Sequence, residues 1–557
     1  MAEELISIHV RESSRSRQQS QELLRGQMAN EFVFAVVGHV GSGTSTVADQ
    51  LRQILTTFQL RGTPFEVEIL KARKQIESWA QRRERALGVV SEKSITVAKR
   101  LQDWGDDMRA EEDHAAVARR LLNEIRLCRA RKQGTEIGGA TAVLPDGKPR
   151  AYILDAIRHP AEVHLLRSVY QNAFTLIGVV CDEQVREGRI THKFEDARSE
   201  YAREFMKRDA QDPDPEKKHG QRVSDAFHLA DVFLDNTQDR KIGKPAKENP
   251  DWDIPEQLAR LVKIVTHDEI IRPTMAETAM YEAYGAQMRS ACLSRQVGAA
   301  LVDQYGNLIA TGTNEVPRAG GGVYGELFAD VGGSDGKAER PHDHRCAYRE
   351  GSEDRRCQNT HEQNQIINDL IDDLIGGESP LISPKRTDEL RSALRRTRIR
   401  GLLEFSRAVH AEMDALLTAA RKGVPTTGAR MFVTTFPCHY CARHLVSAGV
   451  DEVQYIEPYP KSLAFKLHPD SITKDAVKDW TPPSRNGARV LFRPFTGVAP
   501  RMYRRAFLKD RPLKKDATGE LAIGDPEWGS PWDLGRLSYV QLEAEFSRGL
   551  DRAESEE

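Results

Sequence analysis

Two short motifs in the C-terminal half combine metal-binding residues with a carboxylate that can move protons. A His-x-Glu motif at 410–412 begins one predicted helix, and a Pro-Cys-x-x-Cys motif at 437–441 begins the next. Cysteines three positions apart share one face of a helix, so Cys438 and Cys441 can hold one ion, with His410 as third ligand. An ion with an open position lowers the pKa of its bound water to about 7. Glu412 then serves as general acid and base.

The local context supports a catalytic ion more than a structural one. Pro437 suits the first turn of a helix, whose N–H groups favour the thiolate form of Cys438. An apolar strand at 429–435 separates the two motifs. A C-x-x-C motif alone is often structural zinc or a redox pair, but nothing structural requires Glu412.

Together the two motifs resemble the signature of the zinc nucleobase deaminases, H-x-E…P-C-x-x-C. The resemblance implies a catalytic Zn²⁺ held by His410, Cys438 and Cys441. It also implies that Glu412 carries a proton from water to ring N3 and helps ammonia to leave. The implied fold is a three-layer α/β/α cytidine-deaminase domain.

A hairpin ahead of these motifs narrows the resemblance. Residues 294–300 and 311–317 resemble the first two strands of the deoxycytidylate deaminase family. In that family the position of Asn314 binds the deoxyribose, and Arg295 lies in the same substrate-binding segment. For Asn314 the alternative is a turn residue ahead of Pro317.

Segments 457–462 and 467–471 look like the anti-phage dCTP deaminases, a bacterial defence group. Lys461 and Ser462 suit substrate phosphates, because an ammonium and a hydroxyl both bind anionic oxygens. A solvated loop is the alternative. The resemblance further implies that an antitoxin RNA inhibits the enzyme.

An insert at about 318–405 separates the hairpin from the catalytic helix. It contains candidate ligands for a second, structural Zn²⁺, namely His344, Cys346, Cys357 and His361. Unliganded loop residues are the alternative. The insert ends in an arginine run, Arg391, Arg395, Arg396, Arg398 and Arg400. This run suits phosphates or RNA, or forms a solvated helix face.

The N-terminal half contains a strand that runs into a glycine-rich loop, the context of a P-loop. Its candidate nucleotide-binding residues are Gly38, Gly41, Ser42, Gly43, Thr44 and Ser45. Thr44 stands where such loops have the Lys that reaches the outer phosphates, so phosphoryl transfer is in doubt while nucleotide binding is retained. Asp155 ends a later strand and matches a Mg²⁺-linked acid. An active kinase, a nucleotide sensor and an inert scaffold compete, and the missing Lys favours a sensor.

Strands alternating with helices predict a doubly wound α/β domain that resembles P-loop nucleotide kinases. We expect an N-terminal arm (1–30), this kinase-like domain (31–240), a linker (241–265), a zinc deaminase domain (266–500) and a C-terminal extension (501–557). Net charge is −2, with 39% hydrophobic and 29% charged residues. This composition argues against a membrane protein or a wholly basic nucleic-acid binder. We expect a cytoplasmic homo-oligomer.

The sequence therefore predicts zinc-dependent hydrolytic deamination of free deoxycytidine nucleotides, dCTP and also dCMP, which depletes dCTP in anti-phage defence. The competing enzyme is a polynucleotide cytosine or adenine editor, which shares the metal motif. The competing class is a non-catalytic nucleotide sensor. Near-neutral charge and the Asn314 segment favour the free nucleotide.

Overall fold

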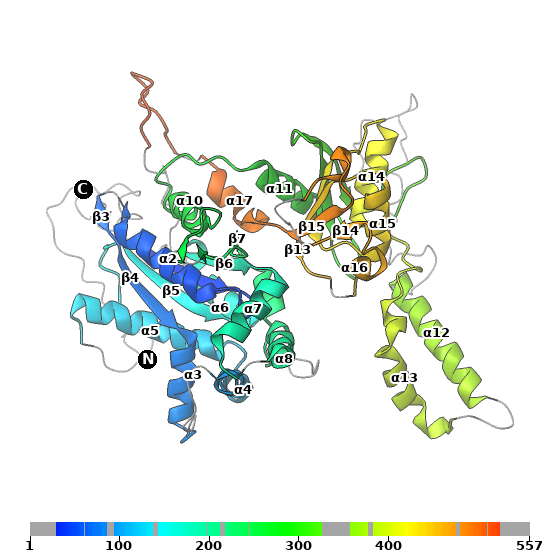
Figure 1. Ribbon diagram of the computed structural model, residues 1–557, viewed down its shortest axis with the longest axis horizontal. Coiled ribbons are helices and arrows are strands. Elements are labelled where there is room, and N and C mark those ends of the chain that lie inside the picture. Colours follow the sequence, from blue (N-terminus) through cyan, green and yellow to red (C-terminus); the bar gives the residue numbers. More distant parts are fainter. Residues whose placement is uncertain are drawn as a thin grey trace, which may run out of the picture.

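The chain forms two lobes, each built around a six-stranded sheet (Figure 1). The computed structural model describes residues 29–60, 62–85, 94–136, 143–196, 198–211, 218–243, 245–325, 357–376, 382–459, 461–474, 480–509 and 511–523. We call the lobe around the first sheet the front lobe and the other the back lobe. No helix among these residues is both long and apolar enough to cross a membrane.

The front sheet has the order β16-β7-β6-β1-β5-β4, and all its pairings are parallel except that of β16. Its strands are β1 (Glu31–Val37), β4 (Glu66–Lys71), β5 (Arg150–Ile157), β6 (Phe174–Val180), β7 (Val232–Asp235) and β16 (Gly497–Val498). The central strands are buried along their whole length, which explains why they read as continuous apolar runs. The parallel α/β character expected from the sequence is confirmed.

Helices cover both faces of the front sheet. The front-lobe helices are α2 (Thr44–Thr57), α3 (Ala72–Gln81), α4 (Ile95–Glu111), α5 (Ala116–Gln133), α6 (Pro160–Tyr170), α7 (Glu183–Lys193), α8 (Ser199–Ala210), α9 (Val223–Phe227), α10 (Ile254–Thr266) and α17 (Pro500–Phe507). Alternate strand residues divide between two cores, as the two-residue period of a strand requires. Phe34 and Val36 pack with α2, α10 and α17, whereas Val33 and Ala35 pack with α5, α6 and α9.

The back lobe has three layers. Its sheet has the order β11-β10-β12-β13-β15-β14. The strands are β10 (Gly298–Val302), β11 (Leu308–Thr313), β12 (Arg430–Thr435), β13 (Glu452–Glu457), β14 (Ile472–Thr473) and β15 (Val490–Pro494). One face packs on α14 (Ala411–Arg421), α15 (His439–Ser447) and α16 (Ala464–Leu467), and the other packs on α11 (Met275–Gln287).

The segment expected to be a linker, and the first residues of the segment expected to be a C-terminal extension, pack in the front lobe. Residues 241–265 include most of α10, where Pro255 lies in the first turn of the helix and does not break it. Beyond β15 the chain returns as β16, which pairs antiparallel with β7, and α17 adds Met502 and Ala506 to the core around α2. The sequence missed this return because β16 is two residues long.

Glu277 joins three of these segments. Its fully buried carboxylate accepts two hydrogen bonds from Arg260 of α10, at 2.7 and 2.8 Å, and one from the backbone N–H of Val498 in β16 at 2.8 Å. It also closes a capping box with Thr274 at the start of α11. This carboxylate therefore connects the first helix of the back lobe to the front lobe.

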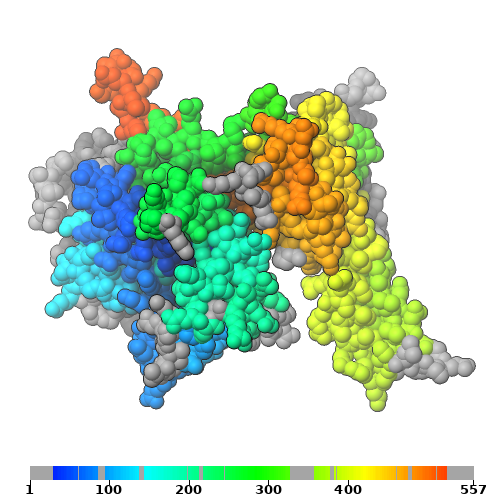
Figure 2. Space-filling model, viewed as in Figure 1, coloured from blue at the N-terminus to red at the C-terminus, as the bar shows by residue number. Residues whose placement is uncertain are grey.

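The described part of the 318–405 insert projects from the back lobe as two helices, α12 (Gln358–Ile375) and α13 (Thr387–Arg395) (Figures 1 and 2). Asn359 and Gln363 of α12 tie its base to the carbonyl of Leu402 by hydrogen bonds of 3.0 and 2.8 Å. None of the residues of α13 is buried. The pair forms an arm outside the two main cores.

Candidate active site

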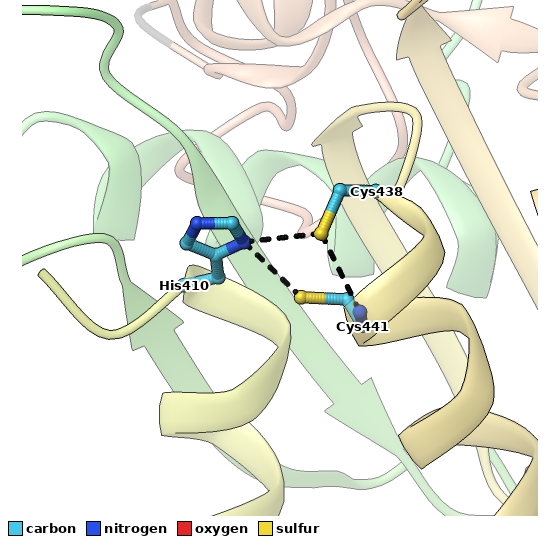
Figure 3. A group of neighbouring side chains, drawn as sticks. All are labelled: His410, Cys438 and Cys441. Carbon is cyan, nitrogen blue, oxygen red and sulfur yellow. Dashed lines mark hydrogen bonds between the residues drawn. The ribbon is translucent and has the colours of Figure 1, made fainter. Parts of the chain in front are cut away.

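The three expected ligands converge at the starts of two neighbouring helices. His410 is the N-cap of α14, and Cys438 is the N-cap of α15, with Cys441 one turn further on. Their side chains point toward one another (Figure 3). The Nδ1 atom of His410 lies 3.3 Å from Cys438 Sγ and 3.4 Å from Cys441 Sγ. Helix starts position all three residues, as the sequence predicts.

The spacing fits a tetrahedral zinc ion. The donor atoms of His410, Cys438 and Cys441 all lie within 4.8 Å of one another. With Zn–N and Zn–S bonds of ordinary length, a tetrahedral ion would separate nitrogen from sulfur by about 3.5 Å. The observed separations of 3.3 and 3.4 Å are close to this value. Three protein donors leave a fourth position for water or substrate.

The protonation states of the three donors depend on one another. A hydrogen bond from Cys441, with a further contribution from His410, lowers the pKa of Cys438 to about 4 against the opposing effect of burial. The bond to Cys438 raises the pKa of His410 to about 9, and the same sulfur together with burial raises that of Cys441. The cluster thus stabilises a thiolate on Cys438, which is the form that binds metal.

Glu412 lies beside the cluster in the first turn of α14 and is 4% exposed. Burial raises its pKa to about 7, and the nearby sulfur of Cys438 contributes to the rise. A carboxyl group with a pKa near neutrality exchanges protons readily in both directions. The geometry therefore places a candidate general acid and base where the sequence predicts one.

Close packing against the sheet fixes α14. A Cβ atom added to Gly312 of β11 would lie 2.0 Å from the carbonyl oxygen of Ala411, so only glycine permits this approach. Asp414, two residues beyond Glu412, accepts a hydrogen bond from the N–H of Thr313 at 3.1 Å. Sequence reasoning missed Asp414, although its place in the first turn after the His-x-Glu motif was the available signal.

The side chain of Asn314 hydrogen-bonds the backbone of the segment just before β10. Its Oδ1 accepts from the N–H of Val297 at 2.7 Å, and its Nδ2 donates to the carbonyl of Arg295 at 2.6 Å. The next residue, Glu315, accepts from the N–H of Ala291 at 2.6 Å. Asn314 therefore shapes the 291–297 segment, and its contact with a sugar stays a prediction.

Arg295 and Lys461 lie close together near the cysteine helix. Arg295 pairs with Glu457, at the end of β13, at 3.3 Å and lies 5.7 Å from the centre of the Tyr459 ring. Burial lowers the pKa of Lys461, and the nearby Arg400 and Arg295 lower it further. Three cations thus gather beside the candidate site, one of them from the arginine run of the insert.

The Ser462 hydroxyl bonds two backbone groups, and its contact with a substrate phosphate stays a prediction. Its hydroxyl donates to the carbonyl of Pro437 at 2.8 Å and accepts from the N–H of Ala464 at 3.3 Å. The hydroxyl hydrogen is therefore engaged in holding the residue before Cys438. In the structure Ser462 braces the metal-binding loop.

Residues 273–457 match the family model of the cytidine and deoxycytidylate deaminase zinc-binding region. The chain contains a deoxycytidylate deaminase-type domain. The matched range includes the donor cluster of His410, Cys438 and Cys441 and the Glu412 carboxyl group beside it. A hydrolytic nucleotide deaminase of this type is therefore supported, and the zinc-binding description agrees with the donor set.

Proteins similar to this chain include phage enzymes. The deoxycytidylate deaminase of Enterobacteria phage T4 is 29% identical over 188 residues, 34% of this chain and 80% of the phage protein. ComE operon protein 2 of Bacillus subtilis is 42% identical over 64 residues, 12% of this chain and 31% of that protein. A solved dCMP deaminase of cyanophage S-TIM5 with dCMP and dUMP is 18% identical, with a TM-score of 0.22; 40% of this chain covers 99% of that one.

The glycine-rich loop of the front lobe connects β1 to α2. Gly41 and Gly43 have φ values of 86° and 85°, in the left-handed region that glycine tolerates. Ser45 donates to the carboxylate of Asp155 at 2.8 Å. Asp155 lies within β5, which continues to Ile157, and not at the strand end expected from the sequence. The side-chain amide of Asn236 donates to the carbonyl of Ser42 at 2.8 Å. The expected loop residues thus form one compact turn at the start of a helix.

A carboxylate that the sequence did not single out also reaches this loop. Asp209, near the end of α8, accepts a hydrogen bond from the N–H of Val40 at 2.7 Å. Its other oxygen pairs with Arg158 at 2.9 Å, and Arg158 also donates to the carbonyl of Gly38 at 3.1 Å. Burial raises the pKa of Asp209, and Arg158 opposes this rise. No motif in the sequence marks Asp209, because the residues that it bonds are distant from it in the chain.

Two of the four candidate ligands for a second zinc lie among the described residues. His344 and Cys346 lie outside the described residues. Cys357 and His361 begin α12, and Cys357 Sγ lies 3.4 Å from Ser294 Oγ. Within the described ranges, the group of three or more His, Cys, Asp or Glu donors close enough for one ion is the one at His410. The second zinc therefore stays a prediction.

Proposed function

We propose that the chain hydrolyses the 4-amino group of free deoxycytidine nucleotides, dCTP and dCMP, with zinc as the catalytic ion. The observation that carries this proposal is the buried Glu412 beside a His410–Cys438–Cys441 cluster whose spacing fits tetrahedral zinc. The match to the deoxycytidylate deaminase zinc-binding region supports the same reaction type.

In the reaction, a C–O bond forms at C4 of the cytosine ring, the C4–N bond breaks, and water and cytosine become uracil and ammonia. When bound, zinc supplies Lewis acidity that makes water acidic enough to react near neutral pH. Glu412 takes a proton from the attacking water and delivers it to ring N3. It then hands the second proton to the departing amine, so that ammonia leaves neutral. Its pKa near 7 suits both directions of transfer.

In this proposal, Asn314 and Arg295 orient the nucleotide. The amide of Asn314 retains one N–H beyond its bond to Arg295 and a lone pair beyond its bond to Val297, and these groups suit the deoxyribose hydroxyl. Arg295 is held by Glu457 at 3.3 Å, and its remaining N–H donors suit a phosphate. Lys461 and Arg400 add charge for the further phosphates of dCTP.

The front lobe binds a regulatory nucleotide with Mg²⁺. Ser45 and Asp155, bonded to each other at 2.8 Å, are the residues that would hold Mg²⁺. Thr44 in place of Lys favours binding without phosphoryl transfer. This arrangement suits an enzyme that depletes dCTP during phage infection and must be restrained before it. The proposal also includes an antitoxin RNA that inhibits the enzyme and assembly of the chain into a homo-oligomer.

The reaction is tested by incubating zinc-loaded protein separately with dCTP, dCMP, CTP and single-stranded DNA, and resolving the products by chromatography. Glu412→Gln keeps the size of the side chain and removes the proton carrier, and it should lower conversion by about 10²–10⁴-fold. Glu389→Gln on the exposed face of α13 is the matched control and should convert at the parent rate. Uracil formed only in the polynucleotide would overturn the proposal in favour of an editing enzyme.

A further inference from the structure

Some backbone N–H groups of the phosphate loop in the front lobe already donate hydrogen bonds within the protein. The N–H of Val40 donates to Asp209, and the N–H of Ser42 donates to the carbonyl of His39 at 3.0 Å. Among the residues that the structure describes, no acceptor is bonded to the N–H groups of Gly41, Gly43 and Thr44. Donors therefore stay available toward the start of α2, whereas the donor at Val40 is taken.

Asp209 is held at the loop from several directions. It is 1% exposed, and its two oxygens accept separately from Val40 at 2.7 Å and Arg158 at 2.9 Å. Arg158 in turn donates to the carbonyl of Gly38 at 3.1 Å, so the guanidinium links the carboxylate to the first residue of the loop. A buried carboxylate with these partners is a fixed part of the site.

The two ends of such a loop serve different phosphates. The N–H groups at the start of the helix hold the inner phosphates, and the loop Lys reaches toward the outer ones. This chain has Thr44 in place of that Lys and Asp209 bonded at Val40, on the side of the loop away from the helix. The first feature removes the Lys charge, and the second takes up one N–H donor, on the side of the outermost phosphate.

We propose that Asp209 occupies the place of the terminal phosphate, so that the loop takes nucleoside diphosphates in preference to triphosphates. Asp209 is thereby a specificity-determining residue of the front lobe. This inference rests on the proposed nucleotide binding at the loop and not on the proposed deamination. It implies that the regulatory nucleotide differs in phosphate number from dCTP, so one nucleotide does not fill both sites.

The first test compares mant-ADP with mant-ATP on the full chain with Mg²⁺, by fluorescence titration. Adenine nucleotides distinguish this loop from the deaminase site, and excess dUMP, the product of the proposed reaction with dCMP, occupies the deaminase site without being consumed. The parent protein should bind mant-ADP at least about tenfold more tightly than mant-ATP, which corresponds to one charge repulsion near the site. Equal affinities would overturn the inference without requiring any variant to fold.

The second test changes Asp209 itself. Asp209→Asn with Arg158→Gln removes the carboxylate and its partner together, so no unpaired charge stays behind, and it should bring the two affinities within about threefold of each other. Asp231→Asn is the matched control, because Asp231 is 5% exposed and also accepts from a backbone N–H and an arginine, those of Leu176 and Arg167.

The control should keep the preference for the diphosphate. An unchanged preference in the double variant would show that Asp209 does not set it. Absence of binding of either nucleotide, with dCMP still deaminated, would reject the phosphate site and leave the proposed reaction intact.

Discussion

The two lobes each contain a loop-to-helix junction of the same local design, and the junctions differ in the groups that surround them. Each site lies where a loop enters a helix: Cys438 is the N-cap of α15, and Gly43 is the N-cap of α2. In the back lobe three side chains turn their donor atoms toward a common centre, where these atoms lie within 4.8 Å of one another. In the front lobe an amide and a carboxylate of the protein, Asn236 and Asp209, already bond the loop.

The difference shows that a motif specifies a backbone shape more firmly than it specifies an occupant. Glycines at positive φ build the front loop whether or not a phosphate enters it. Two sulfurs and an imidazole nitrogen within 4.8 Å have few uses besides holding an ion. Removing the expected occupant should therefore affect the two lobes unequally.

The largest effect is expected from removal of the metal. Treatment with a chelator such as 1,10-phenanthroline, or the substitution Cys438→Ser, should abolish deamination, because the three donors lose their common partner. Added Zn²⁺ should restore the chelated parent and not the variant. Nucleotide binding by the front lobe, followed by fluorescence, should be unchanged. Parallel loss of both activities would contradict the contrast between the lobes.

A large effect on stability is expected where the lobes join. Glu277→Gln leaves Arg260 without its buried partner and weakens the bond to Val498, so the free energy of unfolding should fall by about 3–5 kcal/mol. Denaturant titrations monitored in each lobe should both shift. Glu256→Gln, on the exposed first turn of α10, is the control and should change little. A shift confined to one lobe would show that the lobes unfold independently.

The pH should affect the front lobe through His159, the N-cap of α6. Its Nδ1 accepts from the N–H of Ala161 and its Nε2 bonds the carbonyl of Lys218, and burial lowers its pKa to about 4. Below the unfolded pKa of about 6.5 the unfolded chain takes a proton that the native ring refuses, so stability falls by about 1.4 kcal/mol per pH unit down to pH 4.

The variant His159→Asn keeps a neutral capping group and should flatten this dependence in thermal unfolding between pH 7 and pH 4. His164→Asn, at an exposed position of the same helix, should leave the slope as it is. An equal slope in the parent and in His159→Asn would assign the acid sensitivity to other groups.

The smallest effect is expected from restoring the loop Lys. Thr44→Lys returns a cation to the phosphate loop and should raise mant-ATP affinity about tenfold. Deamination of dCMP measured without a nucleotide at the front loop should not change, because the substitution does not touch the deaminase site. Thr46→Lys, two residues further along α2, should not reproduce this gain in affinity. If Thr44→Lys fails to tighten binding, the absent charge is not what separates this loop from ordinary phosphate loops.

Much of the architecture could be predicted because it depends on local patterns. Buried strands such as β1 and β6, the loop before α2 and the helix starts at His410 and Cys438 all carry their signal within a few residues. The metal donors were therefore foreseen with their helices. β4 was missed because its glutamates and lysine interrupt the apolar run.

What could not be predicted depends on contacts between distant parts of the chain. Asp209 meets Val40 across 169 positions, and Glu277 meets Val498 across 221. No local pattern distinguishes these acids from the many solvated ones. Ser462 was singled out by a local pattern, but its hydroxyl donates to the carbonyl of Pro437. Side-chain direction is decided by tertiary packing, which spacing alone does not encode.

The late return of β16 to the front sheet sets an order of assembly. The strand that covers β7 is made by the ribosome only after the whole deaminase-type lobe, since β16 follows β15 in the chain. Until then the nascent front lobe has an open sheet edge and an uncovered apolar surface where α17 will lie. The front lobe therefore combines segments that are translated before the back lobe with one that is translated after it, so the edge of its sheet at β7 stays open until residues 497–507 have been made.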